Sequence, residues 1–159
     1  MWFRDPFPHF DLDSDFQTSC DIFSGRPFDV HHNSPNNGFV FVRSNNRTIE
    51  FYKLWISSRL KYPGMRQQEV FLRIIHRAHT KKIGLRIRFL DTDYFGGFCT
   101  PSKDFNRVCT MHANCCFKLH QKIPDLNTIL EDWKSYVNTS LKTNQRMSVH
   151  WRAPDKCRM

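Results

Sequence analysis

The sequence contains no long hydrophobic run, and no stretch approaches the roughly eighteen uncharged apolar residues that a transmembrane helix needs. Residues 1–6 carry no apolar core of the kind that begins a secretory leader. The chain also lacks an internal repeat, a low-complexity linker, a phosphate-binding Gly-rich loop and a Ser-His-Asp order typical of hydrolases. These absences exclude a membrane bundle and a repeat protein, and they predict one globular domain with no membrane span.

Aromatic and positively charged residues are what the sequence does contain. Fifteen Phe and 40% hydrophobic residues in 159 predict a real core and argue against disorder. The net charge is +9, and residues 59–88 hold nine Lys and Arg against Glu69 alone, whereas residues 1–30 are acidic. Such a run favours an anionic partner, namely phosphate, nucleic acid or a membrane surface, although a solvated basic face has the same composition.

The hydrophobic pattern predicts both strands and helices. The expected elements are strands over 15–23, 39–42 and 83–90, a loop over 24–37, and helices from Asn46 to Pro63, over 67–78 and over 125–141. Asp125 is expected to cap the last helix. The inward stripe of the first helix is expected to hold Ile49, Tyr52, either Trp55 or Ile56, and Leu60. This order is typical of an α/β or α+β fold, with a mixed sheet flanked by helices.

Two segments contain groups that bind metal ions. Asp91-Thr92-Asp93 follows a predicted strand, where two carboxylates can hold a divalent cation, but a polar exit from the strand is the more common reason for such a triplet. Residues 109–116 place His112 among three Cys without a second pair of ligands, which disfavours structural zinc. His112 could instead be one metal or phosphate ligand completed by distant residues, or a structural histidine.

Two polar turns are candidates for ligand contact. Asn36-Asn37-Gly38-Phe39 leads into a predicted buried strand, where a Gly lets a ligand approach the backbone closely. Gln67-Gln68-Glu69 begins a predicted helix after Pro63-Gly64. The plain alternatives are an ordinary Asn-Gly turn and a helix cap.

The cysteines leave the cellular compartment open. Six cysteines are many for a cytosolic protein and few for a small disulfide-stapled one, and the sequence does not say how they pair. Two acceptor triplets for N-linked glycans, Asn46-Arg47-Thr48 and Asn138-Thr139-Ser140, favour a secretory lumen only slightly, because such triplets arise by chance.

Several stretches of the chain resemble one known family in a consistent order. They are residues 1–7, 36–39, 44–52, 62–64, 89–92, 94–99, 110–116, 132–134 and 151–154, together with Cys157. Over nearly its whole length the chain resembles the plant nucleotide-diphospho-sugar transferase domain of glycosyltransferase family 77. The resemblance implies a GT-A fold, which is a Rossmann-like α/β/α sandwich, and a retaining, Mn²⁺-dependent glycosyltransferase. Its donor would be a nucleotide-diphosphate sugar of the UDP-sugar type, and its acceptor a cell-wall polysaccharide or glycoprotein in the Golgi lumen.

The resemblance also implies roles for individual residues. His112 would be the downstream ligand of the metal or the diphosphate. Substrate-binding positions would be Asn36, Gly38 and Phe39 around the donor sugar, and Gly96 and Gly97 in an acceptor-side loop. Gln67 and Gln68 occupy the catalytic position where the family tends to have Asp-Gln, so a role that needs the missing carboxylate is weakened.

The family's metal-binding Asp-x-Asp lies directly before the stretch that matches residues 1–7. We therefore expect these residues to form the C-terminal portion of a transferase domain, over 1–141, followed by a basic tail over 142–159. We also expect this polypeptide alone to be truncated or degenerate, with weak or no activity and without the Golgi membrane anchor that family members carry.

Two other classes of function compete with the transferase. A polyanion-binding or nucleic-acid-binding module would use the basic run, with Arg86 and Arg88 on one strand face and Trp55 and Tyr62 stacking on bases. A small zinc-stabilised interaction domain would be built around residues 109–116. The transferase ranks first, so no nucleic acid is expected as a partner, and the zinc module ranks last.

Overall fold

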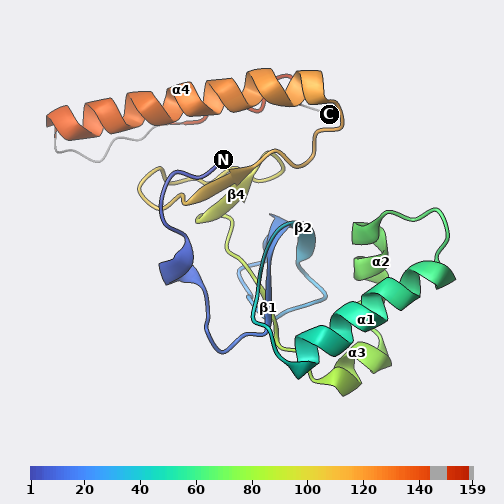
Figure 1. Ribbon diagram of the computed structural model, residues 1–159. Coiled ribbons are helices and arrows are strands. Elements are labelled where there is room, and N and C mark those ends of the chain that lie inside the picture. Colours follow the sequence, from blue (N-terminus) through green and yellow to red (C-terminus); the bar gives the residue numbers. More distant parts are fainter. Residues whose placement is uncertain (144–149, 158–159) are drawn as a thin grey trace.

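The computed structural model describes residues 1–143 and 150–157, and these form a mixed α/β protein (Figure 1). Its elements in chain order are the 3-10 helix η1 (Phe7–His9), β1 (Phe16–Ile22), β2 (Ser34–Val42), α1 (Asn46–Lys61), α2 (Gln67–Ile74), α3 (Ala78–Ile83), β3 (Ile87–Phe89), β4 (Phe95–Gly97), β5 (Thr110–His112) and α4 (Leu119–Thr143). No helix among these residues is both long and apolar enough to cross a membrane. The predicted class, a mixed sheet with helices packed beside it, is confirmed.

One half of the molecule is a three-stranded sheet in the order β2-β1-β3, with α1, α2 and α3 gathered beside it (Figure 1). β1 runs antiparallel to β2 and parallel to β3, so the sheet is mixed. Phe16 on β1 packs against Phe51 and Phe71 of α1 and α2, and all three side chains are fully buried. Burying aromatic area on this scale is the main force that holds the helices to the sheet.

The other half is the two-stranded parallel sheet of β4 and β5, which lies beneath the long helix α4 (Figure 1). Its separate core contains Phe98, Met111 and Ile129, and Trp151 from the last described segment packs against it. A disulfide between Cys116 and Cys157 ties that segment back to the start of α4. The protein therefore has two hydrophobic cores, one for each sheet.

The N-cap of helix α1 is Asn45, one residue before the predicted Asn46. The Asn45 side chain accepts a hydrogen bond from the Thr48 backbone, and the Thr48 hydroxyl accepts one from the Asn45 backbone, which makes a capping box. The predicted inward stripe was wrong for Ile49 and Leu60, whose side chains are exposed. It was right for Trp55, which is buried against α2, and it omitted the fully buried Phe51, which packs against the same helix.

The predicted helix over 67–78 and strand over 83–90 are both shorter in the structure. α2 ends at Ile74, whose carbonyl accepts a hydrogen bond from the Thr80 hydroxyl, and α3 follows as a separate helix. Gly84 ends α3 in the left-handed conformation, with φ of 72°, so the strand cannot begin before this turn. The buried positions Ile87 and Phe89 of the predicted strand are confirmed.

Asp125 does not cap the last helix, because α4 begins at Leu119 and passes through this position. The buried Asp125 carboxylate accepts hydrogen bonds from the backbone N–H groups of Asp155, Lys156 and Cys157. It therefore anchors the C-terminal segment to α4. The boundary between 1–141 and the tail 142–159 stays a prediction, and 144–149 and 158–159 of that tail lie outside the described residues.

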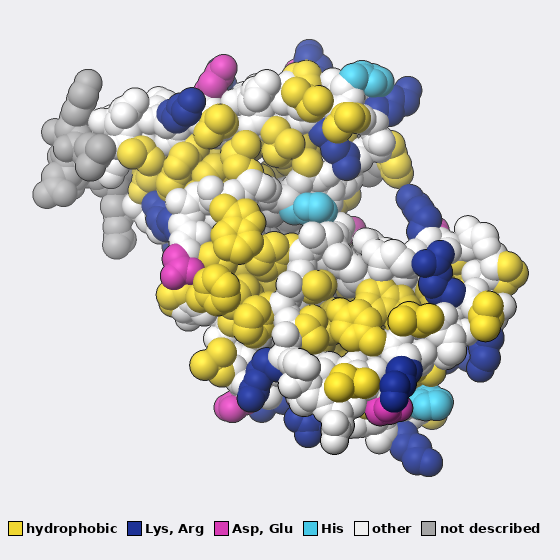
Figure 2. All heavy atoms as spheres, viewed as in Figure 1, with side chains coloured by type: hydrophobic (Ala, Val, Ile, Leu, Met, Phe, Trp, Pro, Cys, Tyr) yellow, Lys and Arg dark blue, Asp and Glu magenta, His cyan; other side chains and the backbone are white. Residues whose placement is uncertain are grey.

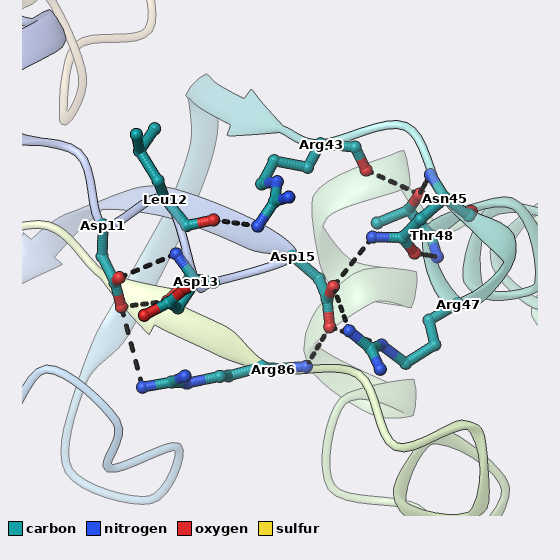
Figure 3. Close-up of polar contacts among 10 residues, drawn as sticks. Asp11, Leu12, Asp13, Asp15, Arg43, Asn45, Arg47, Thr48 and Arg86 are labelled. Carbon is teal, nitrogen blue, oxygen red and sulfur yellow. Dashed lines mark hydrogen bonds and ion pairs between the residues drawn. The ribbon is translucent and has the colours of Figure 1, made fainter.

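A buried carboxylate, Asp15, joins the start of β1 to α1 and to the approach to β3 (Figure 3). It accepts hydrogen bonds from the Asn45 amide at 2.8 Å, from Nε and a terminal nitrogen of Arg47 at 2.8 Å each, and from the Arg86 backbone at 2.9 Å. Burial would raise the pKa of Asp15, but these donors, with Arg47 first, hold its pKa below the usual value. The charged carboxylate is therefore part of the folded structure.

Replacing Asp15 should destabilise the fold sharply. Asp15→Ala leaves the Arg47 guanidinium and two further donors without their acceptor, and we expect the free energy of unfolding to fall by about 3 kcal/mol. Urea unfolding followed by circular dichroism measures this. The matched control is Asp13→Ala in the same acidic turn, whose exposed side chain should change stability by less than about 0.5 kcal/mol. Equal losses in the two variants would contradict the role given to Asp15.

Candidate functional site

A cavity of about 780 Å³ opens between the two halves of the protein. Its walls come from β2, from the end of α1 and the start of α2, and from the segment that joins β5 to α4. Figure 2 shows a hollow between the start of α4 and the helices α1 and α2. Because both halves contribute walls, the cavity depends on how the two sheets are joined.

Asp21, near the end of β1, makes that join. Its Oδ1 accepts a hydrogen bond of 2.7 Å from the Asn36 amide on β2 and another of 2.7 Å from the Asn114 amide after β5. The other end of the Asn114 amide accepts from the Cys99 backbone, and the Thr100 hydroxyl donates to the Asp21 carbonyl. One carboxylate thus fixes β2 of the first sheet to the segment that follows β5 of the second.

Beside these hydrogen bonds, Gly38 packs against the imidazole of His112. A Cβ atom added to Gly38 would lie 2.3 Å from Nε2 of His112 and 2.9 Å from Oδ1 of Asn36. The same Asn36 oxygen accepts a hydrogen bond from the Gly38 backbone at 2.8 Å. Glycine is needed here for space, because any side chain would displace the imidazole.

His112 is half-buried, and it lines the cavity. Burial lowers the pKa of its imidazole, and the positive charges of Lys122 and the chain's amino group lower it further, against a smaller opposing effect of Asp21. The ring is therefore neutral near pH 7 and keeps one unprotonated nitrogen. An unprotonated imidazole nitrogen is able to bind a metal ion or accept a proton.

Positive charge dominates the rest of the lining. Arg59, Arg66 and Lys122 reach the cavity from α1, from the residue before α2 and from α4. Two lining residues are acidic. Asp21 already accepts hydrogen bonds from two amides, and Glu69 caps α2 and forms an ion pair with Arg66 at 3.3 Å. The cavity is suited to an anion larger than a single carboxylate.

The structure brings together most of the residues singled out in the sequence. Asn36, Gly38, Gln67, Gln68 and His112 all line this cavity. The remaining three lie outside its lining. Gly97 packs against the Asn114 amide, and Gly96 packs against the Ser102 backbone. Phe39 contacts Trp2 and Phe95 in an aromatic cluster, with ring centroids 5.9 and 5.4 Å apart.

Sequence reasoning missed Asp21, Arg59 and Lys122. Asp21 has its partners 15 and 93 residues away in the chain, so no local motif marks it. Arg59 belongs to the basic run noted above, but nothing in the run separates it from its eight neighbours of like charge. Lys122 carries no signal of its own.

The structure argues against a structural zinc site at the cysteines of 109–116 and against a cation site at Asp91-Thr92-Asp93. Cys115 pairs with Cys99 and Cys116 pairs with Cys157 in disulfides, so neither sulfur is a thiolate that could ligate zinc. Asp91 accepts from the Asp93 backbone, and Asp93 pairs with Arg107 at 3.0 Å. That triplet is the polar strand exit that the sequence favoured.

A divalent cation would find one suitable ligand in the described cavity lining. The neutral nitrogen of His112 fits Mn²⁺, which accepts imidazole and oxygen donors. The Asn36 oxygen is engaged by the Gly38 N–H, and one Asp21 oxygen is engaged by two amides. The lining therefore fits a cation as a partner of His112, with its other ligands supplied by a bound diphosphate or by residues beyond this cavity.

Comparison with known proteins identifies the family. Residues 1–126 match the family model described as nucleotide-diphospho-sugar transferase, which is well over half of the chain. The chain belongs to the nucleotide-diphospho-sugar transferase family. The assignment to glycosyltransferase family 77 and the full GT-A architecture stay predictions.

Two relatives from Arabidopsis thaliana carry no assigned function. The uncharacterized protein At4g15970 is 49% identical over 155 residues, covering 98% of this chain and 42% of the relative. The uncharacterized protein At1g28695 is 36% identical over 155 residues, covering 95% of this chain and 46% of the relative. The chain thus spans less than half the length of either relative. No solved structure shows significant similarity to it.

The contact between Gly38 and His112 can be tested by a double-mutant cycle. Gly38→Ala should lower the free energy of unfolding by about 1–3 kcal/mol, because the new methyl group overlaps the imidazole. In a His112→Ala background the ring is gone, so most of that loss should disappear. Thermal and urea unfolding of the four proteins give the coupling. An equal loss in both backgrounds would show that the imidazole does not lie against Gly38.

Proposed function

We propose that this chain supplies the wall of a glycosyltransferase site that holds the diphosphate of a nucleotide-sugar donor. The observation that carries the proposal is the cavity in which a neutral His112 and three cationic side chains surround one space. A diphosphate is the part of such a donor that carries the negative charge, and guanidinium groups bind phosphate oxygens in pairs. Family membership supports the same ligand class.

In this proposal each residue of the wall has a separate task. Arg59 and Arg66 stabilise negative charge on the diphosphate as it leaves. Asp21 positions Asn36, which with Gly38 lines the donor side. Gln67 and Gln68, at the start of α2, present amide groups to the donor and carry no charge, so they orient it and do not exchange protons.

A divalent cation, Mn²⁺ in the proposal, would be held on the protein side by His112. When bound it neutralises charge on the leaving diphosphate. The finer expectations follow from the resemblance alone: a UDP-sugar donor, retention of configuration, a polysaccharide or glycoprotein acceptor near Gly96 and Gly97, and a Golgi lumenal location.

The nucleic-acid alternative loses its stacking surface in the structure. Trp55 is 8% exposed and donates its indole N–H to the Gln67 carbonyl, so it cannot stack on a base. Tyr62 is covered by Arg77, whose guanidinium lies 5.8 Å from the ring centroid. Arg88 donates to the His9 carbonyl and to Gln17, so it is directed toward the protein. The basic run is therefore divided among different tasks.

Binding of inorganic pyrophosphate and of UDP tests the cationic wall. We expect Arg59→Gln to weaken both by about tenfold, which is about 1.4 kcal/mol, measured by isothermal titration calorimetry. The matched control is Arg73→Gln on α2, which removes the same charge outside the cavity lining. Equal weakening in both variants would mean that only the overall charge attracts these anions, and absence of saturable binding would contradict the site.

The metal role of His112 has its own test. Mn²⁺ should tighten UDP binding to the wild-type chain, and it should have no such effect on His112→Ala, because that variant lacks the protein's ligand. The same titrations with and without Mn²⁺ measure this, and Mn²⁺ paramagnetic resonance reports the bound ion directly. His120→Ala, an exposed histidine on α4, is the control. Tightening that persists in His112→Ala would remove His112 from the metal site.

A further inference from the structure

We infer that Asn46 and Asn138 carry N-linked glycans. Both lie in the acceptor triplets Asn46-Arg47-Thr48 and Asn138-Thr139-Ser140. A triplet alone predicts little, so the inference depends on three properties of the folded chain: its disulfides, the exposure of both asparagines, and their distance from the cavity.

The disulfides place the chain in an oxidising compartment. Cys99 and Cys115 are joined, as are Cys116 and Cys157, with Cα atoms 5.3 and 5.0 Å apart. Both distances are ordinary for a disulfide. Such bonds persist in the secretory lumen and are reduced in the cytosol. Since N-glycosylation takes place in the same lumen, a chain that keeps these two bonds also meets the glycosylation machinery.

Asn46 is the first residue of α1, and its side chain is exposed. The capping bonds of this helix are made by its neighbours Asn45 and Thr48, and both polar groups of the cap remain in place when a sugar is attached to Asn46. The Arg47 guanidinium is held by hydrogen bonds to Asp15. The folded structure therefore accommodates a glycan here without losing a contact that the described residues show.

Asn138 lies on α4 between Tyr136, which is buried against Phe105, and the helix end. The Asn138 side chain is exposed, and the neighbouring Thr139 hydroxyl donates to the Ser135 carbonyl within the helix. The side of α4 that carries Asn138 thus faces solvent, whereas Ile129 and Tyr136 face the core. A bulky polar group is tolerated only on such a face.

Both asparagines are far from the cavity along the helices that line it. Asn46 begins α1 and Arg59 lines the cavity near the end of the same helix, which is about 20 Å at 1.5 Å per residue. Lys122 lines the cavity at the start of α4, and Asn138 lies about 24 Å further along. Glycans at the two sites would leave the cavity open.

The reaction is the transfer of an oligosaccharide from a lipid-linked diphosphate donor. The amide nitrogen of the asparagine forms a bond to C1 of the first sugar and loses one proton. The bond between that C1 and the diphosphate oxygen breaks, and the lipid diphosphate leaves. The transfer occurs on the unfolded chain as it enters the lumen, so the helical state of both triplets in the folded protein does not prevent it.

The test is expression of the chain behind a heterologous secretory leader in cell-free translation with microsomes. We expect two steps of lower electrophoretic mobility, both removed by peptide N-glycosidase F. Asn46→Gln and Asn138→Gln should each remove one step, and the double variant should remove both. Asn127→Gln is the control, because Asn127-Thr128-Ile129 on the same helix is no acceptor triplet and its replacement should leave both steps.

A chain that shows no glycosidase-sensitive step would overturn the inference, and a step that persists after one replacement would overturn the assignment of that asparagine. The same samples, unfolded in denaturant and alkylated either directly or after reduction, report the disulfides. Two alkylated thiols, those of Cys20 and Cys109, are expected before reduction and six after it. Six alkylated thiols before reduction would remove the compartment argument. The test involves no donor sugar, so it stands or falls separately from the transferase proposal.

Discussion

The candidate site depends on one carboxylate, Asp21, that holds two amides from different sheets. Asn36 comes from the irregular part of β2, and Asn114 follows β5, so this pair of hydrogen bonds is where the two halves of the protein meet at the cavity. Both bonds are charge-assisted, which makes them stronger than bonds between neutral groups. With the amides fixed, Gly38 and His112 are held against each other and the imidazole faces the cavity.

Two disulfides also stabilise the cavity wall. The Cys99–Cys115 bond lies directly beside the Asn114 amide, and the Cys116–Cys157 bond fixes the segment that leads into α4. Cys115 and Cys116 themselves line the cavity, and α4, which begins three residues after Cys116, contributes Lys122 to it. The first core, around Phe16 and Phe71, fixes the other two cations through α1 and α2. Disulfides therefore hold one part of the cavity wall, and the aromatic core holds another.

The sequence predicted the local features and missed those that depend on distant partners. The strand over 39–42, the positions Ile87 and Phe89 and the helical nature of α1 follow from short-range periodicity. The predicted burial of 39–42 was wrong, because its side chains are half-buried or exposed, and β2 already begins at Ser34, inside the predicted loop over 24–37. The inward face of α1 was right at Trp55 but omitted Phe51, because Phe51 packs against Phe71 of α2, a partner that no pattern within α1 reveals. The local pattern predicted Asp125 as a helix cap. It could not show that this carboxylate accepts hydrogen bonds from backbone N–H groups 30 residues further along the chain. For the site, the resemblance selected Asn36, Gly38 and His112, and the structure added the charges around them.

The most direct test of the account is the pKa of the His112 imidazole, measured by nuclear magnetic resonance in a chelator, with and without UDP. We expect a value below that of a free histidine in the unliganded protein, because burial and Lys122 disfavour its protonation. A bound diphosphate brings negative charge to the ring and should raise that value clearly. A His112 pKa that stays the same at saturating UDP would place the diphosphate elsewhere and contradict the site.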